Sequence, residues 1–463
     1  MKRTLLIAIF LTIQPVLGAT LVVNQTTPCT TGDAYYNSIQ NAIDNASSGD
    51  RIVVCNGTYY EVLTIDKDNL TIEGYNKPII SASKNPNNNV VTIYGNYTTI
   101  QGFVIRDAYG DNFNVYGIYM DGIKSCNIKD VEIVNITAIN DYNAVGIVAE
   151  DVEDITIENV KIRDIYAEAD GWGDGIDAFG TDITIRNYEI KNLTGWSWAI
   201  WLEGSNIIVD NGVIEDLMST YEDVAGIVIL GSNGLVRNFR IHNLTAPTSV
   251  GVYGGNISNV EIRDGKIWNL QGESYGIYDG IMSNEKIPTI SRSTGIVETD
   301  TIRIQLLGNN NLIDNVEIFN CLYGIVFGVS NTNKIRNCYI HDNGHGIYLY
   351  SSSYNTIERN IIENNTLADT GIYISSGSND NEIHENCFIN NYPQAYDDGS
   401  NNNWDRNYWD PPIDTIPGSA NSRDNDPLPY CPCFPKVPML NTLSLAILVI
   451  SLVTVALLRL RRL

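Results

Sequence analysis

Residues 331–364 contain one structural unit written twice, and this repeat limits the possible folds more than any other feature of the chain. The unit is an Ile, a second Ile five residues later, and an Asp or Asn two residues after that. Its copies are Ile335–Ile340–Asp342 and Ile357–Ile362–Asn364, 22 residues apart. Short alternating apolar runs separated by Asn, Ser and Gly indicate strands joined by tight turns. A period of this length without a helical segment predicts a β-solenoid.

The same unit recurs through most of the chain. Its other copies close at Asp107, Asn135, Asp164, Asn192, Asp216, Asn243, Asn269 and Asn320. The closing residues lie 22 to 29 positions apart, except for a gap of 51 that we interpret as two coils with an irregular insert around residues 281–300. The pattern predicts an all-β fold, a right-handed parallel β-helix of about a dozen coils over residues 96–400, in which each coil buries its Ile face on the next.

These repeats resemble those of the pectate-lyase-like β-helix superfamily, in particular its NosD-like subfamily, over about residues 30–430. The resemblance implies the fold and leaves the activity open, because this fold carries lyases, hydrolases, epimerases, adhesins and inert scaffolds. Residues 36–61 resemble the N-terminal cap of such proteins. Ile39, Ala42, Ile43 and Ala46 share one face of a predicted helix that would cover the open end of the first coils, within residues 19–95.

Both ends of the chain indicate export. Residues 1–18 combine Lys2 and Arg3 with a short apolar run and small residues, as a signal peptide does. Residues 401–438 read as a terminal cap followed by a Pro-rich stalk. Residues 439–463 contain an uncharged apolar stretch followed by three Arg, which predicts a C-terminal transmembrane helix. The arrangement also resembles the sorting signals of archaeal-type surface proteins, so either a retained helix or a sorting-enzyme product would anchor the protein at the cell surface.

Charge and cysteine usage agree with an exported protein. Leaving out the five basic residues of the termini, 24 basic residues face 54 acidic ones, a net charge of −30, so nucleic acid is not an expected partner. Cys29 and Cys55 flank the predicted cap, and we expect a disulfide between them, with two free thiols as the alternative. The pairing of the other cysteines stays open: Cys126, Cys321, Cys338, Cys387, Cys431 and Cys433.

Ten sequons predict N-glycosylation of an exported chain. They are Asn24, Asn45, Asn56, Asn69, Asn96, Asn135, Asn192, Asn243, Asn256 and Asn364. The recurring Asn and Asp of the turns are expected to be structural, with side-chain amides that bond backbone groups left unpaired at each bend.

A candidate ligand-binding face follows from the coils between residues 95 and 280. Longer loops rich in Tyr, Trp and acids precede the Gly-Ile strand of each coil, and equivalent loops of a solenoid gather on one face. The residue after each inward Ile should point outward. The resulting aromatic positions, with those of the loops, are Tyr119, Trp172, Trp196, Trp201, Tyr253 and Tyr278. An exposed aromatic ladder beside carboxylates is suited to binding glycans. The alternative is an ordinary solvated sheet surface, on which Tyr and Val occur because they are favourable strand residues.

Three carboxylates on the same face form a candidate catalytic site. Asp177 interrupts the outward column, Asp174 precedes it, and Glu203 follows one coil later. With a coil spacing of about 4.8 Å, the Asp177 and Glu203 carboxyls should lie roughly 6–9 Å apart, near the range of inverting glycosidases. The alternative is ordinary variation of the repeat.

The sequence therefore predicts an exported, membrane-anchored surface β-helix glycoprotein with a structural, adhesive or glycan-binding role and the cell envelope or glycans as partners. A polysaccharide-processing hydrolase or lyase centred on Asp174, Asp177 and Glu203 is the alternative. No cofactor is expected, although Ca²⁺ would suit the acidic loops. No metal site is predicted: NosD-type copper handling calls for clustered His, Met or Cys, and the four His and five Met here are scattered.

Overall fold

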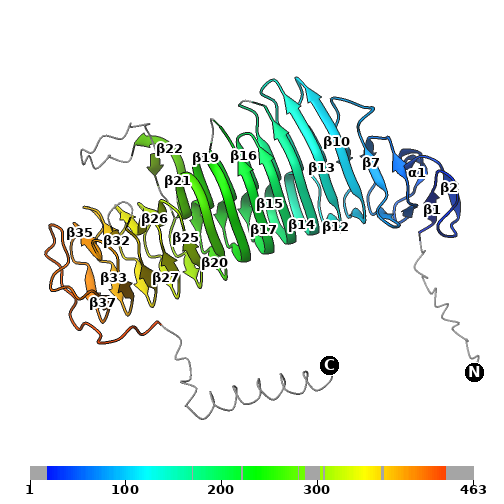
Figure 1. Cartoon of the computed structure of the whole chain (residues 1–463). Coiled ribbons are helices and arrows are strands. Elements are labelled where there is room, and N and C mark those ends of the chain that lie inside the picture. The colour runs from blue at the N-terminus through cyan, green and yellow to red at the C-terminus, as the bar shows by residue number, and fades with distance from the viewer. Residues whose placement is uncertain are drawn as a thin grey trace, which may run out of the picture.

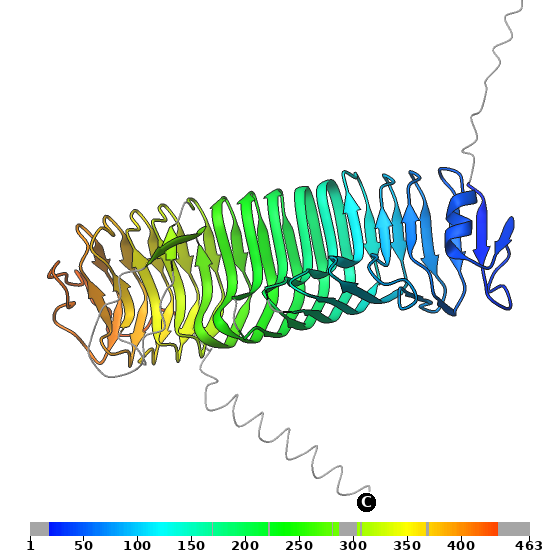
Figure 2. The same cartoon turned by 90° about the horizontal axis from the view of Figure 1, so that it is seen from above.

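The protein is an elongated parallel β-helix (Figures 1 and 2). The computed structural model describes residues 18–168, 170–220, 223–279, 281–286, 303–305, 308–366 and 370–433. The predicted all-β solenoid is confirmed, because strand after strand pairs in parallel with the equivalent strand of the next coil. The predicted signal segment, up to residue 17, and the predicted membrane segment 439–463 lie outside the described residues. Within the described part, no helix has the length and hydropathy needed to span a bilayer.

Each coil contributes strands to three faces, A, B and C, in that chain order. Face A contains β1 (Thr20–Val23), β3 (Arg51–Val54), β6 (Thr71–Gly74), β9 (Thr99–Gln101), β12 (Asn127–Lys129), β20 (Glu261–Arg263), β24 (Leu312–Asp314), β27 (Lys334–Arg336), β30 (Thr356–Glu358), β33 (Glu382–His384) and β36 (Asn403–Asp405). Face B contains β4 (Thr58–Tyr59), β7 (Ile79–Ser81), β10 (Val104–Asp111), β13 (Glu132–Ile139), β25 (Glu317–Phe319), β28 (Tyr339–His341), β31 (Ile361–Glu363), β34 (Cys387–Ile389) and β37 (Tyr408–Asp410).

Face C carries the candidate site. It contains β5 (Leu63–Ile65), β8 (Val91–Ile93), β11 (Val115–Asp121), β16 (Ser197–Ser205), β18 (Val224–Ser232), β26 (Tyr323–Gly328), β29 (His345–Tyr350), β32 (Thr370–Ile374) and β35 (Ala395–Asp397). In the middle coils the chain bends from one face to the next without leaving strand geometry. These long strands are β14 (Ala144–Ala167), β15 (Gly173–Thr194), β17 (Ile208–Met218), β19 (Leu235–Ser258) and β21 (Lys266–Asp279).

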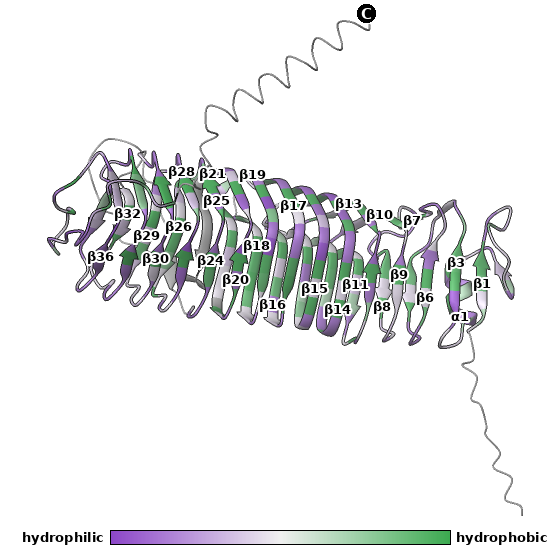
Figure 3. Ribbon diagram, turned by 90° about the horizontal axis from the view of Figure 1, so that it is seen from below, coloured by the Kyte–Doolittle hydropathy of each residue, from purple (hydrophilic) through white to green (hydrophobic). Residues whose placement is uncertain are grey.

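Columns of Ile fill the interior. Ile105, Ile133 and Ile162 pair in register on face B and are fully buried, and Ile190 continues the column. Figure 3 shows apolar positions following the strands along the rod. Burial of each such side chain stabilises the fold by roughly 1.5–3 kcal/mol. The predicted stacking of Ile on Ile is confirmed.

The turn between faces B and C was predicted to use its Asn and Asp side chains on the backbone, and this is wrong for the exposed turns. These residues adopt positive φ, as Asn135 and Asn192 do at 59° and 57°. Asn and Asp tolerate this left-handed conformation better than other residues with a side chain. Their amides bond the side chain of the equivalent turn residue on the preceding coil instead: Asn192 Nδ2 donates to Asp164 Oδ1 at 2.6 Å.

A second Asn ladder, buried in the C-terminal coils, does bond the backbone. Asn386 is fully buried and its Nδ2 donates to the Ile357 carbonyl at 2.8 Å. Its Oδ1 accepts from the backbone N–H of Asn360 at 3.0 Å. Buried backbone groups need such partners, so this ladder supplies the hydrogen bonds for the backbone N–H and C=O groups at the bends between the short strands.

The predicted N-terminal helix is present as α1 (Ile39–Asn45), with Ile39, Ala42 and Ile43 buried. The Ser38 side chain caps it by accepting from the Asn41 N–H. A short strand, β2 (Ala34–Tyr36), pairs with β1 just before the helix. The expected disulfide joins Cys29 and Cys55 across 26 residues.

The 51-residue gap between Asn269 and Asn320 holds one coil, not the two that were predicted. Ile267 pairs directly with Ile318, and Asn320 Nδ2 donates to Asn269 Oδ1. The additional residues leave the coil after β21 and include β22 (Ile281–Lys286) and β23 (Arg303–Gln305), which pair antiparallel with each other. A hairpin whose two strands pair with each other adds residues without adding a coil. The spacing of the repeat therefore gives too many coils here.

Candidate functional site

Asp174 and Asp177 lie near the start of β15 on the outer side of face C. Asp174 and Asp177 are three residues apart, and in a regular strand such residues would point to opposite sides. Here Gly175 and the inward-facing Ile176 take the intervening positions, and the two Asp side chains hydrogen-bond to each other. A Cβ at Gly175 would lie 2.3 Å from the Ala199 carbonyl oxygen of the next coil, so a larger residue here would force the two coils to shift. The same close approach explains the Gly that precedes Ile in other coils.

Both carboxyl groups are buried, with exposed fractions of 0% for Asp174 and 5% for Asp177. Val145 and Val148 lie beside them on the preceding coil. On the following coil, Trp201 pairs with Asp177, and the backbone N–H of Trp198 donates to Asp174 Oδ1 at 2.6 Å. The expectation that Asp177 reaches solvent is therefore wrong, because its neighbours along the rod cover it.

Burial determines the protonation of the pair. It raises the pKa of Asp174 to about 8. The pKa of Asp177 is raised well above its usual range by burial first, and then by the nearby charges of Asp174 and Glu150. Asp174 Oδ2 and Asp177 Oδ1 accept from no N–H or hydroxyl group among the described residues. A proton held between the two carboxyls supplies the missing donor, so the pair keeps at least one proton at neutral pH.

Four indoles from two adjacent coils cover this pair: Trp172, Trp196, Trp198 and Trp201, here called the Trp cluster. Trp198 and Trp201 meet nearly at right angles, with centroids 4.4 Å apart. Trp172 lies 5.3 Å from Trp201, and Phe179 lies 5.1 Å from Trp201, both edge to face. All four indoles are half-buried. The buried indole Nε1–H groups of Trp196, Trp198 and Trp201 have no hydrogen-bond acceptor in the described structure.

The rest of the predicted aromatic ladder does not form an exposed platform. Tyr253 is only 4% exposed and packs with Val228, Val326 and Tyr348 in an apolar cluster on the outside of face C. Tyr119 is half-buried and donates its hydroxyl to Glu150 at 2.6 Å. Tyr278 pairs in register with Tyr253, and its side chain lies outside the described part. The outward column thus packs against itself, because neighbouring coils bring large side chains into contact.

Glu203 lies on β16 and is exposed. Its partner in register is Phe179, whereas Asp177 pairs with Trp201. Asp174 and Asp177 are therefore buried together, whereas Glu203 lies two positions further along the adjacent strand and is exposed to solvent.

A stacked ladder on face B was missed. His242, Trp268, Phe319 and His341 follow one another in register, and His242 stacks on Trp268 at 4.3 Å. These residues each follow an inward Ile of face B, so the outward-column argument would have found them had it been applied there. Their rings stack on one another, which leaves edges rather than faces free for a ligand.

A groove of about 830 Å³ follows the turns between faces A and B, from Asn159 to Lys266. Its charged rim is largely paired internally: Lys161 binds Glu189, and Lys266 binds Glu317. Such exposed pairs contribute little to stability, and they also leave few free charges for an ionic ligand.

The described residues that could ligate a metal do not form a suitable site for copper. In the described residues, one group could supply three ligand atoms, the sulfur atoms of Cys387, Cys431 and Cys433, which lie within 4.8 Å of one another. Cys387 and Cys431 form a disulfide, so they offer no thiolates, and this set does not fit copper.

Comparisons with known proteins agree with this description. Residues 204–416 match the family described as periplasmic copper-binding protein (NosD). A cell surface glycoprotein of Methanothermus fervidus is 32% identical over 133 residues, which cover 28% of this chain and 20% of that protein. The chain therefore matches about a fifth of the length of this relative.

Solved structures show lower similarity. A mannuronan C-5 epimerase module from Azotobacter vinelandii is 16% identical, with 85% of this chain and 91% of that chain covered and a TM-score of 0.38. A surface adhesin of Streptococcus pneumoniae is 13% identical, with 79% and 89% covered and a TM-score of 0.35. Strand pairing and family match together identify the chain as a parallel β-helix with NosD-like repeats over residues 204–416.

Proposed function

We propose that the protein is an exported cell-surface β-helix that binds glycans through the Trp cluster without cleaving them. The observation that carries this proposal is the arrangement of the four indoles, which meet at steep angles on one outer face. Indoles packed edge to face keep ring surface available for stacking on sugar rings, unlike the parallel stacks elsewhere on the rod. The relative described as a cell surface glycoprotein supports the location.

The buried carboxyl pair supports binding over catalysis. A general acid must come within hydrogen-bond reach of the glycosidic oxygen. Asp174 and Asp177 are enclosed by their neighbours, and a polysaccharide cannot contact them while the indoles stay in place. Their role in the proposal is to hold the strand that carries the Trp cluster, through the bond from the backbone N–H of Trp198 to Asp174.

A glycoside hydrolase remains the second candidate, favoured by one observation. Asp174 has a raised pKa of about 8 and so holds a proton at neutral pH, as a general acid does. This activity would require the indoles to move aside and Glu203 to act from the next coil.

The test uses the purified full-length protein and a panel of uronate and neutral polysaccharides, with and without Ca²⁺. Binding is measured by calorimetry, and cleavage by new reducing or unsaturated ends. We expect binding to at least one polysaccharide without new ends. New ends that disappear in Asp177→Asn would establish the hydrolase instead, and absence of binding across the panel would contradict both candidates.

A further inference from the structure

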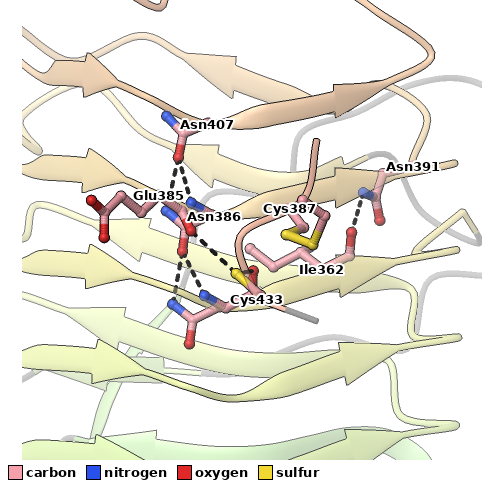
Figure 4. Close-up of a disulfide and its surroundings, with 9 residues drawn as sticks. Ile362, Glu385, Asn386, Cys387, Asn391, Asn407 and Cys433 are labelled. Atoms are coloured by element: carbon pink, nitrogen blue, oxygen red, sulfur yellow. Dashed lines mark hydrogen bonds between the residues drawn. A yellow bond between two sulfur atoms is a disulfide. The ribbon is translucent and has the colours of Figure 1, made fainter. Parts of the chain in front are cut away.

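A cluster of three sulfur atoms lies where the C-terminal segment meets the last coils. Cys387 belongs to β34 and is fully buried, and Cys431 reaches it from the segment that follows β37. Cys433 is a free thiol two residues further on. Its sulfur lies within 4.8 Å of both disulfide sulfurs, and Figure 4 shows it beside the Cys387–Cys431 bond.

Backbone contacts hold Cys433 in this position. Its thiol donates to the Glu385 carbonyl at 3.2 Å and lies 3.4 Å from the Asn360 carbonyl. These two carbonyls belong to turns of adjacent coils, and the buried Asn ladder fixes those turns, with Asn360 bonded to Asn386 and Asn386 to Asn407 (Figure 4). The third sulfur therefore lies against a rigid part of the rod.

We propose that Cys387, Cys431 and Cys433 form a thiol–disulfide exchange site with two alternative pairings. The Cys433 thiolate attacks Cys387 Sγ, the Cys387–Cys431 bond breaks, and the Cys387–Cys433 bond forms. The proton lost by Cys433 is taken up by the departing Cys431 thiolate. The reaction is an isomerisation, so no external oxidant or reductant is needed.

The exchange changes how the C-terminal segment is attached. Moving the bond from Cys431 to Cys433 shifts the covalent attachment by two residues, roughly 7 Å of extended chain. Cys431 then becomes a free thiol.

Burial of the Cys433 thiol controls the rate of the exchange. It raises the pKa of the Cys433 thiol to about 12, since desolvation outweighs its hydrogen bonding. Only the thiolate attacks a disulfide, so the rate should rise roughly tenfold per pH unit from neutral to moderately alkaline pH.

The experiment follows the pairing in the full-length protein. The protein is incubated at pH 7, 8 and 9, quenched in acid, unfolded, labelled with a maleimide at low pH and analysed by peptide mass spectrometry. We expect label on Cys433 at first and on both Cys431 and Cys433 after incubation, with a rate that does not depend on protein concentration. Label confined to Cys433 at every pH would overturn the proposal.

Two variants test the geometry. Cys431→Ser should form the Cys387–Cys433 bond under mild oxidation, whereas Cys433→Ser should keep a single pairing at every pH. Cys338→Ser is the matched control, because it removes a buried free thiol two coils before that of Cys387 and should leave the exchange unchanged. If the Cys431→Ser protein keeps its melting transition but leaves Cys387 and Cys433 both free, the proposal is overturned; if this variant does not fold, the labelling of the unaltered protein decides.

Discussion

The side chains of Asp174 and Asp177 hydrogen-bond to each other beneath the Trp cluster, and both residues are buried from solvent. Two acids in this position cannot both ionise without a large desolvation cost, so they act as one protonated unit. The relationship places a titrating group at the centre of the face proposed to bind glycans.

The first prediction concerns stability against pH. The pKa of Asp174 is raised in the folded protein, to about 8, above an unfolded value near 3.8. Its contribution to stability is therefore complete below about pH 4 and is lost as the pH rises toward 8. Asp174→Asn/Asp177→Asn should remove this dependence, with slopes that differ by about 1.4 kcal/mol per pH unit for one proton. Thermal melts between pH 4 and 9 measure it, and parallel curves for both proteins would contradict it.

The second prediction concerns the buried Asn ladder. Asn386→Ala leaves the Ile357 carbonyl and the Asn360 N–H without their side-chain partners. Each unsatisfied buried group costs about 1–3 kcal/mol, so urea melts should show a loss of about 2–6 kcal/mol for the two groups. Asn211→Gly is the control: Asn211 is exposed with a φ of 58°, which Gly adopts readily, and we expect a change within about 0.5 kcal/mol. An equal loss of stability in the two variants would contradict the prediction that the buried ladder contributes more to stability than the exposed one.

The third prediction concerns glycines that lie against aromatic rings. A Cβ at Gly265 would lie 2.1 Å from the Phe239 ring, so Gly265→Ala must displace a buried side chain. Overpacking of this kind costs about 1–3 kcal/mol. Gly234→Ala places its Cβ no closer than 3.3 Å to a Val260 methyl and should be tolerated. Circular dichroism melts of the two variants compare them, and a Gly265→Ala protein as stable as Gly234→Ala would contradict the packing described.

The fourth prediction concerns the Cys29–Cys55 disulfide. It closes a loop across 26 residues at the N-terminal end of the rod. Cys29→Ser/Cys55→Ser should lower stability by about 3 kcal/mol, mainly through the greater freedom of the unfolded chain. Limited proteolysis should then cut first between residues 24 and 36. Unchanged protease resistance would mean that other contacts hold this end.

The repeat made most of the fold predictable, because an inward Ile must stack on the Ile of the next coil. Ile105, Ile133 and Ile162 do so in register. The insertion after β21 was misread as a coil, since spacing does not reveal that β22 and β23 pair with each other. The presence and the buried face of α1 were predictable from local signals alone.

The candidate site was predictable only in part. The sequence placed Asp174, Asp177 and three of the four indoles on one face. It could not show that Asp177 is covered, because coverage depends on which side chains of the adjacent coils, Val148 and Trp201, lie over it. Trp198 was missed, although it lies 4.4 Å from Trp201, because it occupies a position outside the outward column that was followed.

The most direct test of the account compares the affinity of the full-length protein for the glycan it binds with that of two tryptophan variants. Trp201→Ala removes a ring at the centre of the Trp cluster, and Trp268→Ala removes a half-buried ring from the ladder on face B. With folding of both checked by melting, we predict that Trp201→Ala weakens binding at least tenfold, about 1.4 kcal/mol, while Trp268→Ala binds as the unaltered protein does. Equal affinity of the two variants, or loss confined to Trp268→Ala, would contradict the account.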